Sequence, residues 1–78
     1  MNPRPRQIKV LNDYNLEILF SNGETKVYDM KKLLDKPPYK SLKDKNIFDT
    51  AQVSEDEMTI EWINGIDVCP DELYNNSI

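Results

Sequence analysis

The chain has 78 residues and a net charge of −4, with 38% apolar and 31% charged residues. A single small domain of this length, residues 1–78, rarely gains more than about 3–5 kcal/mol of net stability from its core alone. One cysteine and no histidine exclude a disulfide framework and the usual zinc sites. No apolar run reaches the roughly 18 residues of a membrane span, and the N-terminus is too polar for a secretory signal. We therefore expect a reduced, cytoplasmic protein without a membrane segment or a cofactor.

The net charge hides an asymmetry along the chain. All ten basic residues lie at or before Lys45 together with six acids, so residues 1–45 carry +4. Residues 46–78 contain eight acids and no base, so they carry −8. This division favours head-to-tail self-contacts or a basic partner for the second half. The alternative is that each half solvates its own surface.

Two alternating segments predict the first hairpin of an antiparallel sheet. Residues 7–11 alternate polar and apolar side chains, and Asn12-Asp13 follows as a turn. Residues 16–21 alternate next and place three apolar side chains on one face: Leu16, Ile18 and Phe20. Asn22-Gly23 predicts a two-residue turn, because both central positions of that turn need positive φ.

This turn fixes the expected register of the hairpin. It pairs Phe20 with Thr25 and Ile18 with Val27 on the inward face. It leaves Leu19 and Tyr28 as diagonal neighbours on the opposite, mostly polar face, where long side chains can touch. We therefore predict a homodimer that buries Leu19 and Tyr28, because two-fold association is the commonest way to cover such a patch.

A short helix and a polar connection follow the first hairpin. Asp29 is the expected N-cap of a helix over Met30 to Lys36, which Pro37-Pro38 ends. Single helical turns are expected in the connection up to residue 48. Its large side chains should close the open side of the sheet. These side chains are Tyr39, Leu42, Ile47 and Phe48.

A second hairpin is predicted in the acidic half. Residues 51–54 and 58–62 form its strands and turn over three consecutive acids. Asn64-Gly65 predicts another two-residue turn, which places Trp62 opposite Asp67. With that register, the side chains of Glu61 and Asp67 lie on opposite faces of the hairpin.

The chain ends in a predicted helix that begins after Cys69. Pro70 suits the first helical position, and Asp71 and Glu72 complement the helix dipole. Cys69 stands where a serine or threonine would complete a capping box with Glu72. The fold class is therefore α+β, an antiparallel sheet of two β-hairpin units with a short helix between them and a short C-terminal helix.

A longer pattern runs through these elements. In the second half it consists of Ile60-Glu61-Trp62, Asn64-Gly65, Asp67, Pro70-Asp71 and Leu73-Tyr74. In the first half it consists of Leu16, Ile18, Phe20, Asn22-Gly23-Glu24, Tyr28-Asp29, Leu33-Leu34, Leu42 and Phe48. In order and spacing this pattern resembles the small bacterial proteins known as domain of unknown function 2442 (DUF2442).

The resemblance implies a compact α+β domain that is often encoded beside a second small protein in what look like toxin–antitoxin pairs. Some longer relatives carry a helix-turn-helix after this domain, and we expect none in this protein, whose last residue is Ile78. The chain departs from the pattern at Cys69, where relatives more often have a small hydroxylated residue.

Several residues have both a structural and a functional interpretation. Trp62 suits a core position on an inward strand face, and it also suits an interface anchor. Cys69 at a helix N-terminus resembles a reactive thiol, but without histidine the chain offers no standard base for nucleophilic catalysis. Four acids could hold a divalent metal or could form a solvated acidic rim. They are Glu61, Asp67, Asp71 and Glu72.

The sequence favours a protein-interaction role over catalysis. We predict an antitoxin-like, non-catalytic protein that binds a small basic protein encoded nearby. Its predicted surface consists of Trp62, Asp67, Asp71, Glu72, Leu73 and Tyr74. The alternative is a nucleic-acid-binding autoregulator that uses Arg4, Arg6, Lys9 and Lys31-Lys32, but the overall acidity disfavours DNA binding by this chain unaided. The remote alternative is a metal-dependent enzyme.

Overall fold

Six short strands form two three-stranded antiparallel sheets in a computed structural model that describes residues 2–78. Sheet A, in the order β1-β2-β3, consists of β1 (Pro5–Val10), β2 (Asn15–Phe20) and β3 (Thr25–Asp29). Sheet B, in the order β4-β5-β6, consists of β4 (Gln52–Val53), β5 (Ile60–Glu61) and β6 (Asp67–Val68). The predicted α+β class is confirmed, and each predicted hairpin unit belongs to its own sheet.

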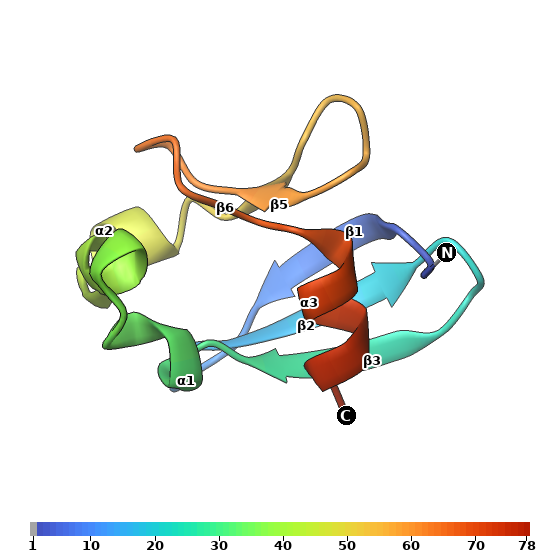
Figure 1. The fold of residues 1–78 in the computed structure, drawn as a ribbon, viewed down its shortest axis with the longest axis horizontal. Helices are drawn as coiled ribbons and strands as arrows, with labels where there is room; N and C mark the ends of the chain where they lie inside the picture. The colour runs from blue at the N-terminus through green and yellow to red at the C-terminus, as the bar shows by residue number, and fades with distance from the viewer. Residues whose placement is uncertain (1) are drawn as a thin grey trace.

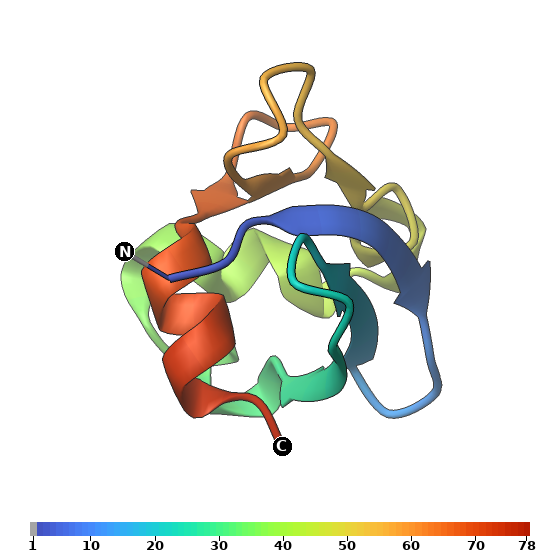
Figure 2. The same cartoon turned by 90° about the vertical axis from the view of Figure 1, so that its right-hand side faces the viewer.

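Four short helices of residues 2–78 cover one side of sheet A, and the first three of them connect β3 to β4. They are α1 (Lys31–Leu34), the 3₁₀ helix η1 (Pro37–Lys43), α2 (Lys45–Phe48) and α3 (Pro70–Asn76). Figure 1 shows sheet B above sheet A, with α1 and α2 at one end and α3 across the strands of sheet A. In Figure 2, sheet A curves around the helices, which leaves its outer face uncovered.

The core between these layers is wholly apolar. No polar or charged residue is buried among residues 2–78. The buried side chains come from both sheets and all the helices: Leu16, Ile18, Phe20, Tyr28, Met30, Leu33, Leu34, Leu42, Phe48, Ile60, Trp62, Val68 and Leu73. Leu42 and Phe48 close one side of the core, as predicted, and Tyr39 and Ile47 pack partly buried against it.

The two Asn-Gly turns differ from the prediction in the same way. The amide of Gly23 donates to the Phe20 carbonyl (3.0 Å), and the Phe20 amide donates to the Glu24 carbonyl (2.8 Å). Gly23 has φ +91°, whereas Asn22 is not among the residues with positive φ. This is a three-residue loop, in which a type I turn is followed by a left-handed glycine. The expected two-residue turn at this position is wrong.

The extra loop residue shifts the pairing of β2 and β3 by one position. Ile18 pairs with Lys26 and Leu16 pairs with Tyr28. A one-residue shift moves every side chain to the other face of a strand. Tyr28 is therefore buried in the core rather than exposed beside Leu19, and Val27 takes the outer position. The predicted self-association patch of Leu19 and Tyr28 does not exist as such.

The second turn repeats this geometry in sheet B. Gly65 has φ +88°, its amide donates to the Trp62 carbonyl (3.0 Å), and the Trp62 amide donates to the Ile66 carbonyl (2.9 Å). Consequently Asp67 pairs with Glu61 instead of Trp62. Directly paired residues share a face of a sheet, so the expectation that these two acids lie on opposite faces is wrong.

The helix ends largely follow the sequence signals. The Asp29 carboxylate accepts a hydrogen bond from the Lys31 amide (2.9 Å), although α1 spans only Lys31–Leu34 and its N-cap position is Met30. The shorter helix reflects the proline pair, which enters η1 directly. Pro70 opens α3 after Cys69, as predicted, and the Cys69 side chain makes no capping bond.

Candidate functional site

The outer side of sheet B presents an acidic row. Gln52 pairs with Glu61, and Glu61 pairs with Asp67, so one residue from each strand faces outward in line. Like charges directly opposite each other destabilise a sheet. Among the ion pairs of residues 2–78, none offsets Glu61 or Asp67. The row therefore holds two uncompensated carboxylates next to one another.

A shallow hollow continues this row toward the turn between β4 and β5. It has a volume of about 420 Å³ and is lined by Gln52, Ser54, Glu55, Asp56 and Glu61. Its charged groups are all carboxylates, and the Gln52 amide donates to Glu61 (3.4 Å). We define the acidic face as Glu55, Asp56, Glu61 and Asp67. It offers hydrogen-bond acceptors suited to ammonium or guanidinium groups.

Asp56 organises the turn beside this hollow. Its carboxylate accepts hydrogen bonds from the Ser54 hydroxyl (2.5 Å) and the Met58 amide (3.1 Å). These bonds, the Ser54 bond first, lower the pKa of Asp56 below its usual value, and the positive charge of Arg4 adds to the effect. Asp56 therefore stays ionised at neutral pH. Glu57 in the same turn has φ +56°, an uncommon conformation for a residue other than glycine.

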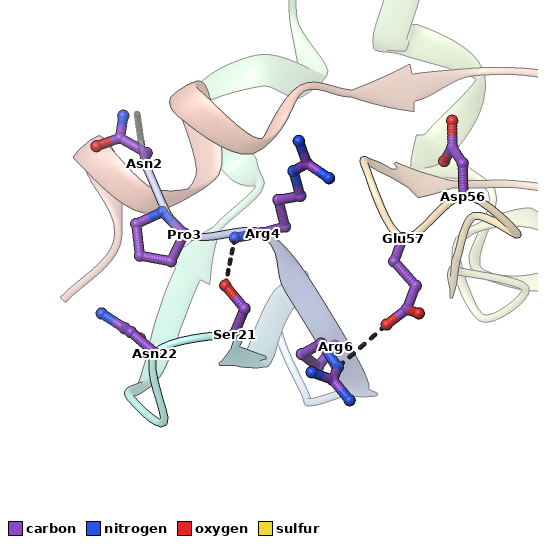
Figure 3. A pocket seen from close by; sticks show the side chains of 8 residues that line it. All are labelled: Asn2, Pro3, Arg4, Arg6, Ser21, Asn22, Asp56 and Glu57. Atoms are coloured by element: carbon purple, nitrogen blue, oxygen red, sulfur yellow. Dashed lines mark hydrogen bonds and ion pairs between the residues drawn. The ribbon is translucent and has the colours of Figure 1, made fainter.

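The basic groups nearest to this acidic turn come from the start of sheet A. Figure 3 shows Arg4 and Arg6 around a groove of about 650 Å³, with Asp56 and Glu57 on its opposite side. Arg6 Nε forms an ion pair with Glu57 (3.0 Å), and the Arg4 amide donates to the Ser21 hydroxyl (3.1 Å). Since charges of both signs line it, this groove attracts neither anions nor cations strongly.

Two of the residues predicted at the partner surface lie in the core instead. Trp62 is 2% exposed, and its indole N–H donates to the Phe48 carbonyl (3.0 Å). Leu73 is fully buried on the inner side of α3. Neither side chain can contact a partner in this conformation. The core interpretation of Trp62 is therefore the correct one.

Two further predicted residues are engaged within the chain. Glu72 accepts a hydrogen bond from the Tyr28 hydroxyl (2.7 Å), and burial, followed by this carboxylate, raises the pKa of Tyr28. The Tyr74 hydroxyl donates to Glu24, which lowers the pKa of that carboxyl, and its ring lies under Lys26 (3.9 Å to the ring centre). These contacts attach α3 to sheet A.

Of the six predicted residues, Asp67 and Asp71 are exposed acids. Sequence reasoning missed Glu55, Asp56 and Ile63. Ile63, which lies between the buried Trp62 and the Asn64-Gly65 turn, is 78% exposed. The predicted two-residue turn would have paired Ile63 with Ile66, and so it gave no reason to expect an exposed position at Ile63.

The basic residues of the nucleic-acid alternative do not form a free basic face. Lys31 contacts two carboxylates, those of Asp13 (3.0 Å) and Asp29 (3.2 Å). Lys32 lies over the Tyr28 ring and donates to the backbone of α3, and Lys9 stands opposite Glu17 in the strand pairing of sheet A. These intramolecular contacts leave less positive charge for phosphate groups.

The metal alternative lacks a ligand cluster among the described side chains. Within residues 2–78, no group of three or more Asp, Glu, Cys or His side chains could hold a metal ion. Cys69 is a free, exposed thiol. No helix in this part of the chain is both long and apolar enough to cross a membrane.

Comparison with known protein families shows which family this chain belongs to. The model of the family described as "Protein of unknown function (DUF2442)" matches residues 5–78. The chain belongs to the DUF2442 family. No curated protein matches it significantly. The comparison therefore establishes the family of this chain and assigns it no activity.

A solved structure shares this DUF2442 fold. It is the crystal structure of the "Putative DNA Binding Protein NE0471" from Nitrosomonas europaea, which is similar with a TM-score of 0.84 and 24% sequence identity. The likeness covers 96% of this chain but only 48% of the other one. This chain thus spans about half of that protein, and at this identity the match shows the fold alone.

Proposed function

We propose that this DUF2442 chain is a non-catalytic protein-interaction domain that binds a basic protein on its acidic face. The observation that carries the proposal is the paired carboxylates of Glu61 and Asp67, which lie side by side beside a hollow lined with acids. Because like charges directly opposite each other destabilise a sheet, a positively charged partner would relieve the repulsion between Glu61 and Asp67.

Ile63 is the apolar contact in this proposal. It is 78% exposed and stands two residues after Glu61 in the chain. Charges around an interface mainly speed association, while a desolvated apolar residue slows dissociation. We therefore assign the acidic face to encounter and Ile63 to retention. This revises the predicted surface, in which Leu73 and Tyr74 had the apolar role.

The family resemblance suggests the partner, a small protein encoded next to this chain, as in an antitoxin-like pair. Its chemistry should include a lysine- or arginine-rich surface. We propose to measure binding of this neighbouring protein by stopped flow at about 50 and 300 mM salt. Because exposed charges are screened beyond roughly 8–10 Å near 0.1 M salt, the higher salt should slow association several-fold and change dissociation little.

Matched substitutions locate the surface. Glu61→Lys should lower the association rate constant about tenfold at low salt. Glu17→Lys makes the same change of charge at a half-buried position on sheet A and should have a much smaller effect. Ile63→Ser should raise the dissociation rate constant. Equal effects of the two lysine substitutions, in chains with unchanged melting temperature, would refute the assignment to the acidic face.

A second candidate is nucleic-acid binding, which the name of the Nitrosomonas europaea protein favours. The exposed lysines of η1 and its flanks would be the contact here, since Lys36 and Lys40 form no ion pair among the described residues. A mobility shift with the promoter of its own operon, with and without the neighbouring protein, separates the candidates. Binding of DNA by this chain alone would replace the protein-interaction proposal.

A further inference from the structure

The outer face of sheet A carries apolar side chains that no part of the described chain covers. The pairing places Lys9, Glu17 and Val27 in one row across the three strands, and Gln7, Leu19 and Thr25 in the next. Leu19 and Val27 are diagonal neighbours on this face, and both are half-buried. The shifted register therefore replaces the predicted pair of Leu19 and Tyr28 by Leu19 and Val27.

Ile78 extends the first row by one position. It exchanges two backbone hydrogen bonds with Val27, of 2.7 and 2.9 Å, and so pairs with the edge of β3. Residues paired in this way point their side chains to the same face. Ile78 is 94% exposed although its backbone is held by these two hydrogen bonds. Its side chain therefore projects from the outer face, and we call it the knob of this face.

A hollow lies on the same face. It has a volume of about 250 Å³ and is lined by Gln7, Ile8, Lys9, Glu17, Leu19 and Thr25. Leu19 is its apolar lining on β2, and Lys9 and Glu17 on its rim bring opposite charges. One face thus presents both a projecting apolar side chain and a recess that could receive one.

We propose that this face binds a second copy of the chain, with Ile78 of each copy in the hollow beside Leu19 of the other. A two-fold interface requires that each surface contain both members of every contact, which the knob and the hollow provide. The charges on the face are balanced, Lys9 against Glu17, so two copies meet without the repulsion that the acidic face would cause.

The edges of sheet A are less suited to self-association. Pro5 and the irregular pairing between Pro5 and Gln7 interrupt the ladder of β1, and Lys9 adds a charge along it. Such features protect edge strands from pairing with another chain. The edge of β3 is occupied at Val27 by Ile78. The outer face is therefore the better suited surface of sheet A for self-association.

Sedimentation equilibrium of the full chain from about 20 μM to 1 mM tests the proposal. We expect a monomer–dimer equilibrium whose dissociation constant rises about tenfold in Ile78→Ser, because an apolar side chain loses its buried position. Leu19→Glu should do the same. Ile63→Ser is the matched control, since it removes an exposed isoleucine from a different surface, and it should leave the equilibrium unchanged.

Cross-linking gives an independent measurement of the contact. In chains with Cys69 replaced by serine, Ile78→Cys in one chain and Thr25→Cys in another should form a mixed disulfide on mild oxidation. Ile63→Cys with Thr25→Cys should not. A monomer at all concentrations up to 1 mM would overturn the proposal. A dimer that Ile78→Ser leaves unchanged would also overturn it, because Ile78 is 94% exposed and its substitution should not disturb the fold.

Discussion

Replacement of Gly65 tests the three-residue loops that determine both sheets. Gly65 has φ +88°, and a Cβ atom added there would meet no atom within 4 Å. The cost of Gly65→Ala is therefore backbone strain alone, about 1–2 kcal/mol. For a domain of this size, each kcal/mol lowers the melting temperature by about 4–8 °C. Gly65→Asn should cost roughly half as much, because asparagine tolerates the left-handed region better.

The neighbouring Asn64 distinguishes the two loop types. In a two-residue turn Asn64 would also have positive φ, so Asn64→Gly would be neutral or stabilising. In the observed loop Asn64 is not among the residues with positive φ, and its amide group donates to Ser41 (2.8 Å). Asn64→Gly should therefore destabilise the protein by about 0.5–1 kcal/mol, because glycine loses more conformational freedom on folding.

Urea denaturation followed by tryptophan fluorescence measures these differences. Trp62 is the only tryptophan and is buried, so its emission reports on the core next to the loop. Gly23→Ala, at φ +91° and with equally open surroundings, is the matched repeat and should cost a similar amount. An Ala substitution at Gly65 that left the denaturation midpoint unchanged, or a stabilising Asn64→Gly, would refute the three-residue loop.

Three further predictions concern the core and the pH dependence of stability. Trp62→Phe should cost about 1–3 kcal/mol in urea denaturation, because it removes volume and a buried hydrogen bond to the backbone of α2. Tyr28→Phe should cost about 1 kcal/mol when Glu72 is present and much less in a Glu72→Ala background, which lacks the acceptor, and a double-mutant cycle by thermal melting would show this. The pKa values of Asp29 and Asp56 are lowered by hydrogen bonds to their carboxylates, so their contribution is present above about pH 4 and is lost as the pH falls through the folded-state values. Asp29→Asn should therefore flatten the fall in melting temperature below about pH 4, and an unchanged slope would contradict this assignment.

Signals that act over one or two residues predicted much of the fold. The proline after Cys69 correctly marked the start of α3, and the alternation in β2 correctly selected its buried face. Asp29 accepts the expected hydrogen bond from the backbone after it. In each case the signal depends on the chemistry of adjacent residues, which the sequence displays directly.

The register could not be predicted in the same way. Asn-Gly suits a two-residue turn with two left-handed residues and also a type I turn followed by a left-handed glycine. Both turns are compatible with the local backbone conformation, and only the packing of side chains in the core distinguishes them. The observed loop buries Tyr28 and leaves Lys26 to reach across to α3, whereas the predicted turn would have exposed Tyr28.

The turn between β1 and β2 shows the same limit. Asp13 and Tyr14 have φ values of +61° and +60°, so a bulky residue occupies the conformation expected of glycine or asparagine. The Tyr14 ring packs edge-on against Phe48 (4.9 Å), and its hydroxyl donates to the Lys43 carbonyl. These distant contacts offset the local strain, and nothing near Tyr14 in the sequence shows them.

The surface residues were the hardest to predict because an exposed position has no partner in the chain to identify it. Ile63 and Ile78 illustrate this, since both are exposed but lie in different settings. Ile63 stands at a turn next to uncompensated acids, which suits a basic protein. Ile78 is held beside a charge-balanced, partly apolar face, which suits a second copy of the chain. Ile63→Ser and Ile78→Ser should therefore impair different associations. If each impaired both, one surface rather than two would account for the binding of this protein.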